Sequence, residues 1–467
     1  MRRFLIVIYC FVLGICTANA QTPKYVFYFI GDGMGVNQVL GTEMYLAELE
    51  GKIGVNPLLF SQFPYVSMAT TYSVVNGVTD SAASGTALAT GHKTKNGTIG
   101  MLQDHSTSVN SIAVWAKESG KRVGIATSVS VDHATPAAFY AHQPSRKNSY
   151  EIGKDLYQAG FDFYAGSDFL EPTKDGEPCL YDLADSSGYV IAYGYDDYKT
   201  LSKKANRMIL FQNKEASKMD KTAIPYAIDQ KEEDLSLEEI THAAIDFLTK
   251  DNKDGFFLMV EGGKIDWACH SNDAATMFKE VLSFENSVRI AYEFYQKHPD
   301  ETLIVVTADH STGGLSLGLG SYDLNLQVLK NQTMSEVMFS NKLNELCKGR
   351  QITWLHVRKA LTECFGFWET VEIDVDTENK LKDIFETSLK VGIDSKESSE
   401  YSQTALMAAE AKRILNEHAL INWSSGGHSA GLVPVCAVGV GAENFSKRTD
   451  NAEIPLKIAA IANYRIR

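Results

Sequence analysis

Five short runs of apolar residues recur along the chain, and their pattern predicts buried β-strands. The runs are rich in β-branched and aromatic side chains and lack the polar alternation of a half-exposed strand. This pattern is typical of central strands in a parallel sheet, which are covered on both faces. The five runs are 25–30, 123–126, 256–260, 303–306 and 435–440.

The segments between these runs have the pattern of helices. Ser236 and Glu239 form a capping-box signal that predicts a helix ending near Thr249. Residues 276–295 carry apolar side chains at helical spacing. Strands that alternate with helices predict an α/β fold, in which a central, mostly parallel sheet has helices on both faces. The segment from about 320 to 422 is richer in charged helical sequence, and we interpret it as a helical insertion or cap.

Residues 1–20 have the pattern of a signal peptide. A basic start is followed by an apolar run, 4–17, and then by a small-x-small sequence that ends at Ala20. We therefore expect cleavage before Gln21 and an exported protein, periplasmic or secreted. The mature catalytic domain would then be 21–467.

Two kinds of membrane attachment are alternatives to a cleaved signal. The apolar run is short for a membrane span, and no second stretch of adequate length follows it. A lipid anchor on Cys16 would require a small residue where Ile15 stands. We therefore expect no stable membrane span.

The net charge of the chain argues against one class of function, and its cysteines allow one disulfide. The formal net charge is −14, which argues against the basic face that a nucleic-acid-binding protein needs. An acidic protein that handles anions must provide its positive charge locally, through metal ions or arginines. Cys347 and Cys364 are close in sequence and could form a disulfide in an oxidising compartment.

Acidic residues and a histidine follow three of the predicted strands. Asp32 follows the first run, Glu261 ends the third, and the pair Asp309 and His310 follows the fourth. Ligands of open α/β sheets bind at the carboxyl ends of the strands. We therefore expect these side chains to meet at one edge of the sheet.

Further residues of metal-ligand type lie nearby in the sequence. Asp266 and His270 are four residues apart, so they would lie on one face of a helix and could hold a Zn²⁺ ion. Asp309 and His310 form a second such pair, and His428 precedes the last apolar run. Any one of these pairs is also typical of an ordinary hydrogen bond on the surface or in the core.

Ser81 stands at the start of a predicted helix that ends at Gly91. A serine at a helix start has its hydroxyl among free backbone N–H groups, which favour a phosphate. The alternative is that Asp80 or Ser81 only caps the helix. Arg146 could bind two phosphate oxygens through its planar guanidinium, although a lone arginine in a loop is usually solvated.

Taken together, these segments resemble the alkaline phosphatase family. The matching motifs appear in the family's order and span nearly all of the mature chain, which no single motif could establish. They are 29–35 (FIGDGMG), 78–84 (VTDSAAS), 90–97 (TGHKTKNG), 133–136 (HATP), 141–142 with 145–146, 260–270, 307–310 (TADH) and 427–428.

The resemblance implies metal-dependent hydrolysis of phosphate monoesters, with a broad substrate range. It makes Ser81 the nucleophile that becomes phosphoserine and Arg146 the phosphate clamp. It also implies two zinc ions and one magnesium ion, and a homodimer. The implied ligands are Asp266, His270 and His428 for one zinc, Asp32, Asp309 and His310 for the second, and Asp32, Thr135 and Glu261 for magnesium.

Two positions depart from the pattern of other family members. Trp267 follows Asp266, and His133 stands two residues before Thr135, where other members carry Asp, Lys or His at one or both positions. Both are candidates for contact with substrate, although packing is the simpler interpretation of Trp267. A histidine at position 133 could bind metal directly and so change the preference of the third site from magnesium.

Two other classes of function compete with this interpretation. A phosphodiesterase or sulfatase of the same superfamily would share much of the site. Ser81 with Arg146 favours monoesters, and the two alanines after Ser81 do not match a sulfatase motif. A phosphate-binding or adhesion protein with a decayed site is the other class, but every expected ligand is present.

Overall fold

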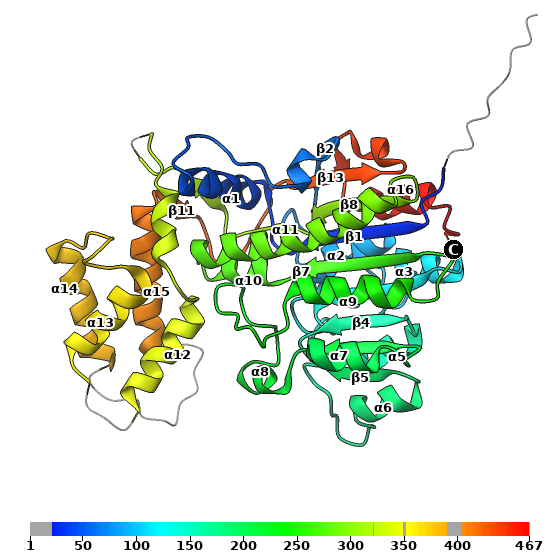
Figure 1. The fold of residues 1–467 in the computed structure, drawn as a ribbon, viewed down its shortest axis with the longest axis horizontal. Coiled ribbons are helices and arrows are strands. Elements are labelled where there is room, and N and C mark those ends of the chain that lie inside the picture. Colours follow the sequence, from blue (N-terminus) through cyan, green and yellow to red (C-terminus); the bar gives the residue numbers. More distant parts are fainter. Residues whose placement is uncertain (1–20, 321, 349–351, 390–402, 467) are drawn as a thin grey trace, which may run out of the picture.

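A ten-stranded sheet forms the centre of the molecule (Figure 1). The computed structural model describes residues 21–320, 322–348, 352–389 and 403–466, so the predicted signal peptide lies outside the described residues. The strand order is β14-β2-β13-β8-β1-β7-β3-β4-β6-β5. The strands are β1 (Tyr25–Gly31), β2 (Tyr65–Thr70), β3 (Arg122–Thr127), β4 (Phe163–Gly166), β5 (Val190–Tyr193), β6 (Met208–Phe211), β7 (Phe256–Gly262), β8 (Thr302–Ala308), β13 (Val433–Gly439) and β14 (Thr449–Asp450).

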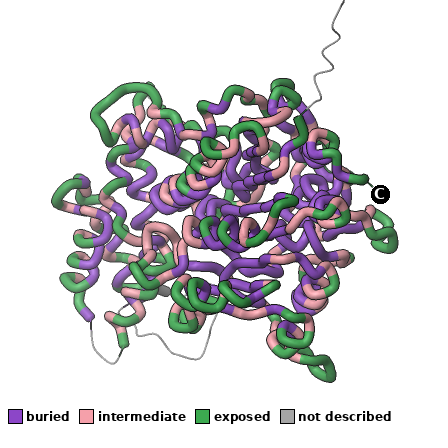
Figure 2. Tube along the Cα trace, turned by 45° about the vertical axis from the view of Figure 1, so that its right-hand side comes forward, coloured by how far each residue is buried: buried purple, intermediate pink, exposed green. Residues whose placement is uncertain are grey.

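Four of the five apolar runs are confirmed as parallel strands of this sheet. β1, β7 and β8 are neighbours, and all of their residues are buried, as Figure 2 shows for the centre of the molecule. β3 pairs with β7 on the other side. Because helices cover both faces of these strands, neither face needs polar side chains.

The fifth run forms β13, and the prediction that it is parallel is wrong. β13 runs antiparallel to both β8 and β2. A strand that is apolar on both faces has the same pattern in either direction, so its sequence does not show whether it runs parallel or antiparallel to its neighbours. The reversal has a consequence for function, because it brings the amino end of β13 to the edge where the parallel strands have their carboxyl ends.

Helices lie on both faces of the sheet, as predicted. α11 packs on β1, β7 and β8, and α9 packs on β3, β4 and β7, while α3 and α4 also contact β3 and β7. Figure 1 shows α9 and α11 in front of the sheet and α2 and α3 behind it. These helices are α1 (Val36–Leu49), α2 (Ser81–Thr90), α3 (Ile112–Glu118), α4 (Ala134–Ala137), α5 (Ser149–Ala159), α6 (Leu180–Ser186), α7 (Tyr195–Leu201), α8 (Lys214–Met219), α9 (Leu237–Thr249), α10 (Lys264–His270), α11 (Ala274–Lys297) and α16 (Glu453–Ile461).

The ends of three predicted helices agree with their sequence signals. Ser236 and Glu239 form the reciprocal capping box that begins α9. The second predicted helix, 276–295, forms most of α11. α2 ends at Gly91, whose φ of 77° is the left-handed conformation that glycine adopts without strain.

The described part of the segment between about 320 and 422 is mostly helical and stands at one end of the molecule (Figure 1). The disulfide that Cys347 and Cys364 could have formed is not present among the described residues, and the Cys364 sulfur instead accepts a hydrogen bond of 3.3 Å from Lys342 Nζ. The elements of the segment are η2 (Leu326–Asn331), α12 (Glu336–Cys347), α13 (Trp354–Phe365), α14 (Val375–Ile384), η3 (Phe385–Leu389) and α15 (Gln403–His418).

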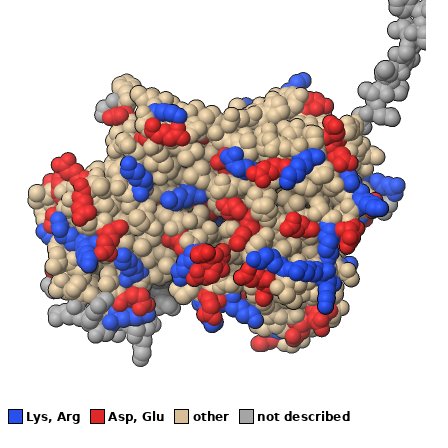
Figure 3. Space-filling model, in the orientation of Figure 1, with Lys and Arg blue, Asp and Glu red and all other residues tan. Residues whose placement is uncertain are grey.

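Both acidic and basic side chains are found on the surface. On the face shown in Figure 3, acidic and basic side chains are interspersed over the core and over the helical segment. None of the helices within the described ranges is both long and apolar enough to cross a membrane.

Candidate active site

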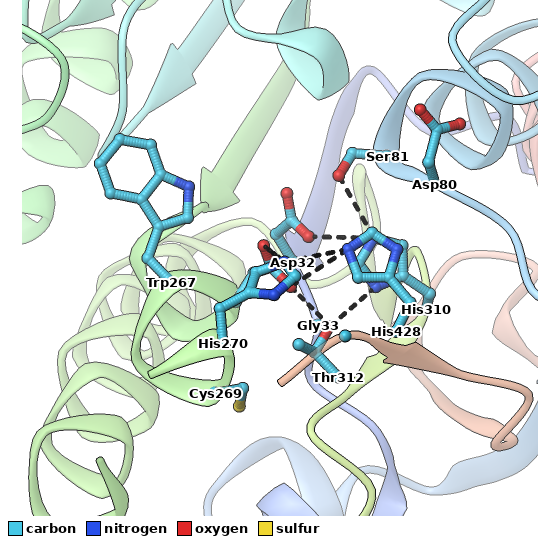
Figure 4. Close-up of polar contacts among 12 residues, drawn as sticks. Asp32, Gly33, Asp80, Ser81, Trp267, Cys269, His270, His310, Thr312 and His428 are labelled. Atoms are coloured by element: carbon cyan, nitrogen blue, oxygen red, sulfur yellow. Dashed lines mark hydrogen bonds and ion pairs between the residues drawn. The ribbon is translucent and has the colours of Figure 1, made fainter. Parts of the chain in front are cut away.

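The predicted acids and histidines do meet at the carboxyl edge of the sheet (Figure 4). β1, β7 and β8 end level with one another, because Gly31 pairs with both Gly262 and Ala308. Asp32 and Asp309 immediately follow β1 and β8, and Glu261 is the penultimate residue of β7. Because these three parallel strands end at the same level, their three carboxylates lie at one edge of the sheet.

Ser81 faces this group from the amino end of α2. Its Oγ lies 3.2 Å from Nε2 of His310. Asp80, and not Ser81, caps the helix, because its carboxylate accepts a hydrogen bond of 3.0 Å from the N–H of Ala83. The Ser81 hydroxyl is therefore left to face the acids and histidines of the sheet edge.

Asp80 also holds Arg146 beside Ser81. The Arg146 Nη1 lies 3.2 Å from Asp80 Oδ2, and Nη2 lies 3.2 Å from Nε2 of His133. The Asp80 carboxylate further accepts hydrogen bonds from the N–H of Gly97. Arg146 is thus oriented by an acid that is itself fixed by the backbone, which suits a residue that must receive an anion.

A first group of possible metal ligands contains Asp266, His270 and His428. The two histidine Nε2 atoms are 3.1 Å apart, and His270 Nε2 lies 3.2 Å from Asp266 Oδ2. Each Nδ1 donates to a backbone carbonyl, that of Gly426 for His270 and that of Thr79 for His428. These bonds fix the tautomer and leave both Nε2 lone pairs available to a metal ion.

A second group, fully buried, contains Asp32, Asp309 and His310. His310 Nε2 lies 3.4 Å from Asp32 Oδ1 and 3.2 Å from Asp309 Oδ2. The other oxygen of Asp309 accepts hydrogen bonds from the backbone N–H groups of Gly33 and His310. This leaves Oδ2 directed into the site.

A third group lies behind Asp32 and contains Glu261, Thr135 and His133. Thr135 Oγ1 lies 3.4 Å from Asp32 Oδ2, and Thr127 donates to the second oxygen of Glu261. His133 Nδ1 is 3.9 Å from Glu261 Oε1. His133 therefore lies close enough to this group for its ring nitrogen to be a candidate ligand of the third metal ion, as the sequence suggested.

The hydrogen bonds of this centre are incomplete in a way that fits metal ions. Four buried atoms receive no hydrogen bond from the described residues: Asp32 Oδ1, Asp309 Oδ2, Glu261 Oε1 and His133 Nδ1. Buried polar atoms are almost always paired, so unpaired oxygens and a nitrogen that converge on small volumes indicate cation sites.

The protonation of these groups is also set by burial. Burial raises the pKa of Asp32 and of Asp309, and neighbouring carboxylates raise both further. Burial lowers the pKa of His310, and it lowers the pKa of His133 to about 3 with help from the charge of Arg146. Neutral histidines and crowded carboxylates need compensating positive charge, which bound cations would supply.

Sequence reasoning missed Thr312. This residue lies in the short strand β9 (Ser311–Thr312), which pairs with β12 (His428–Ser429). Its hydroxyl donates a 2.5 Å hydrogen bond to Asp266 Oδ1 and lies 3.2 Å from His310 Nδ1. Thr312 thereby connects the first and second groups, and only its position two residues after His310 could have pointed to it.

Trp267 lies at the border of the centre. Its ring meets the ring of His133 edge-on, with centroids 6.1 Å apart. In Figure 4 it points away from the cluster of acids and histidines. Of the residues proposed to contact substrate, Arg146 and His133 thus lie beside the centre, and Trp267 lies farther out.

Comparisons with known proteins agree on one family. The model of the family "Alkaline phosphatase" matches residues 23–164 and 199–464. Alkaline phosphatase 3 of Bacillus subtilis (strain 168) is 32% identical over 458 residues, which cover 96% of this chain and 91% of that protein.

Solved structures show the same likeness. A cold-active alkaline phosphatase from a psychrophilic Shewanella species superposes with a TM-score of 0.79 at 27% identity, covering 94% of this chain and 99% of that one. A histidine-to-aspartate variant of the alkaline phosphatase from the Antarctic bacterium TAB5, solved with Mg bound in its M3 site, gives a TM-score of 0.65 at 25% identity, covering 96% of this chain and 99% of that one. The chain therefore belongs to the alkaline phosphatase family and is a metal-binding enzyme that hydrolyses phosphate monoesters.

Proposed function

We propose that the enzyme hydrolyses phosphate monoesters through a phosphoserine formed on Ser81, releasing the alcohol and then inorganic phosphate. One observation carries the proposal. The hydroxyl of Ser81 lies 3.2 Å from His310 Nε2, at the amino end of α2, with the guanidinium of Arg146 held nearby by Asp80. A nucleophile, an anion clamp and a set of cation ligands thus share one small volume.

The proposed ligands follow the three groups of side chains. Asp266, His270 and His428 would hold one zinc ion, and Asp32, Asp309 and His310 the second. Asp32, Thr135 and Glu261 would hold a magnesium ion. Metal ions bound there would neutralise the phosphate and stabilise the entering and leaving oxygens of an in-line displacement.

Residues of the chain itself would bind and orient the phosphate group and supply the nucleophile. Arg146 binds two phosphate oxygens through its planar fork and so orients the phosphorus toward Ser81. The free N–H groups at the start of α2 favour the anion beside Ser81. Ser81 Oγ then forms the bond to phosphorus as the bond to the alcohol oxygen breaks. A second displacement by water releases phosphate and restores the Ser81 hydroxyl.

The identity of the third ion is testable because of His133. The unpaired Nδ1 of His133 beside Glu261 would suit zinc better than magnesium if it became a ligand. Metal analysis of the purified enzyme should give zinc and magnesium in a two-to-one ratio. A third equivalent of zinc, replaced by magnesium in a His133→Asp variant, would contradict the magnesium assignment and make His133 a ligand.

Hydrolysis of p-nitrophenyl phosphate and of bis-p-nitrophenyl phosphate tests the proposed reaction. We expect fast turnover of the monoester at alkaline pH, loss of turnover on chelation, and recovery when zinc and magnesium are added. A preference for the diester would favour a phosphodiesterase instead. Turnover that a chelator does not reduce would contradict the metal-dependent reaction.

We also propose that the enzyme is a homodimer. Large apolar side chains are exposed on β2 and on the segment that follows it, as expected for a surface that a partner covers. The exposed fractions are 49% for Val66, 42% for Met68, 50% for Tyr72 and 59% for Val75. Sedimentation of the wild type against a Val66→Lys, Met68→Lys variant tests this. A monomeric wild type would contradict it.

Three broader expectations complete the proposal. The signal-like start supports export to the periplasm or secretion, and N-terminal sequencing of the secreted protein should begin at Gln21. The segment from about 320 to 422 is proposed as a helical insertion that caps one side of the catalytic domain. The substrate range is proposed to be broad, because Arg146, Ser81 and the metal ligands contact only the phosphate group common to all monoesters.

A further inference from the structure

A pocket of about 570 Å³ lies beside the proposed active site and uses none of the proposed metal ligands. It is lined by α8, the loop that follows α8, α10 and α12, and Figure 1 shows α8 and α12 on opposite sides of the space between them. Its volume is within the range of ~300–1,000 Å³ that is common for small-molecule sites. Its apolar and aromatic wall includes Met219, Pro225, Tyr226, Trp267, Val337 and Met338.

Lys264 supplies a hydrogen-bond donor in the wall of this pocket. The residue is only 3% exposed, and its Nζ lies 3.5 Å from the centroid of the Tyr226 ring and 5.4 Å from that of Trp267. Besides these two rings, the carboxylates of Glu280, Asp220 and Asp229 act on its charge by electrostatic attraction. The two aromatic faces partly stabilise the ammonium, and its N–H groups can donate to a ligand in the pocket that it lines.

Acidic side chains dominate the charged residues around the pocket. Five acids contribute to its lining, against two lysines, Lys231 and Lys264. This excess disfavours a second phosphate or a carboxylate on the ligand, while the acids can accept hydrogen bonds from hydroxyl groups. The five acids are Glu215, Asp220, Asp229, Glu233 and Asp234.

One short helix connects this pocket to the proposed catalytic centre. Asp266 and His270 on α10 belong to the first group of proposed metal ligands, whereas Lys264 and Trp267, three residues apart on the neighbouring side of α10, line the pocket. Trp267 contacts His133, which in turn contacts Arg146. The pocket wall is therefore two residue contacts away from the proposed phosphate clamp.

We propose that this pocket is a subsite for the alcohol part of the substrate and that it selects neutral, planar groups that carry hydroxyls, such as the nucleoside of a nucleoside monophosphate. The ring would pack against Trp267 and Tyr226, and a ring carbonyl or nitrogen would accept from Lys264. The acids would accept from the sugar hydroxyls. The proposal rests on the proposed phosphomonoesterase function and assigns that function a preferred class of substrate.

Filling the pocket from its helical walls tests the proposal without altering the catalytic residues. Val337→Trp on α12 and Ala216→Trp on α8 would each occupy part of it. Val375→Trp is the matched control, because Val375 is 75% exposed on α14 and does not line the pocket. The readout is kcat/KM for adenosine monophosphate and for glycerol phosphate in each variant.

We expect the wild type to prefer the nucleotide, and both pocket variants to reduce this preference by ~10-fold while retaining activity on glycerol phosphate. Adenosine alone should competitively inhibit glycerol phosphate hydrolysis by the wild type and by Val375→Trp, but only weakly by Val337→Trp. Equal kcat/KM for the two substrates in the wild type would overturn the subsite, as would an unchanged ratio in both variants. Absence of turnover of both substrates by the metal-loaded wild type would instead contradict the proposed function itself.

Discussion

Thr312 donates a 2.5 Å hydrogen bond from its hydroxyl to Oδ1 of Asp266, across 46 residues of sequence. The same hydroxyl lies 3.2 Å from Nδ1 of His310, so one small side chain contacts members of both proposed zinc sites. Such bonds fix the orientation of ligands before a metal arrives. The spacing of the two sites therefore depends on a residue that need not itself bind metal.

Replacing Thr312 by valine tests this relationship. The substitution nearly preserves volume and removes only the hydroxyl, so Asp266 loses a donor and His310 a neighbour. We expect zinc affinity to fall by ~10–100-fold, with a matching loss of kcat/KM at limiting zinc. Thr312→Ser keeps the hydroxyl and should stay close to the wild type. Equal zinc affinity in all three proteins would exclude this role.

Arg146 is expected to contribute mainly to binding of the phosphate group. Its guanidinium is oriented by Asp80 and His133, so Arg146→Ala removes the two donors that would bind the phosphate oxygens. We expect KM for a monoester to rise by ~10-fold or more, because charge-assisted hydrogen bonds contribute ~1.5–3 kcal/mol each. The neighbouring Lys147 is exposed, and Lys147→Ala serves as the control. If both variants had the same KM, Arg146 would not be the clamp.

Glu280 gives the fold a pH dependence through a carboxyl that is not one of the proposed metal ligands. Burial raises the pKa of this α11 carboxyl to about 7, against an ordinary value of 4.5, and its Oε1 accepts a hydrogen bond of 2.6 Å from the N–H of Ala227. A carboxyl with a raised folded-state pKa binds its proton more tightly when folded. Its contribution to stability is therefore lost as the pH rises from about 4.5 to about 7.

Glu280→Gln keeps the acceptor and removes the charge. At about pH 8 we expect the free energy of unfolding of the variant, measured by urea denaturation, to exceed that of the wild type by up to ~3 kcal/mol. The difference should vanish near pH 4.5, where both side chains are neutral. Glu293→Gln, at an exposed position on the same helix, should change little. A destabilised Glu280→Gln variant at alkaline pH would show that the charged form is the one the fold requires.

The sequence was most informative where chain direction determines position. Asp32, Glu261 and Asp309 follow or end apolar strands, and parallel strands bring such residues together whatever their order in the sheet. His428 reaches the same edge for the opposite reason, because it precedes the antiparallel strand β13. Nothing in an apolar run specifies its direction, so only the family resemblance linked His428 to the centre.

Other features depend on contacts between segments that are distant in sequence. Thr312 is an ordinary residue of a short strand until Asp266 is found beside it. Lys264 looks like a solvated lysine at a helix start, and only the fold shows that it is buried against Tyr226. Side chains of this kind acquire their roles from tertiary neighbours, which local pattern and propensity do not encode.

Direct detection of a phosphoserine at Ser81 is the measurement that tests the central claim. The metal-loaded enzyme would be quenched in acid during steady-state hydrolysis of p-nitrophenyl phosphate and digested, and the peptide that contains residues 78–90 would be analysed by mass spectrometry. We predict one added phosphate on Ser81, and neither phosphopeptide nor normal turnover in Ser81→Ala at unchanged metal content. Wild-type turnover by Ser81→Ala, or a phosphate on a different residue, would contradict the assignment of Ser81 as the nucleophile.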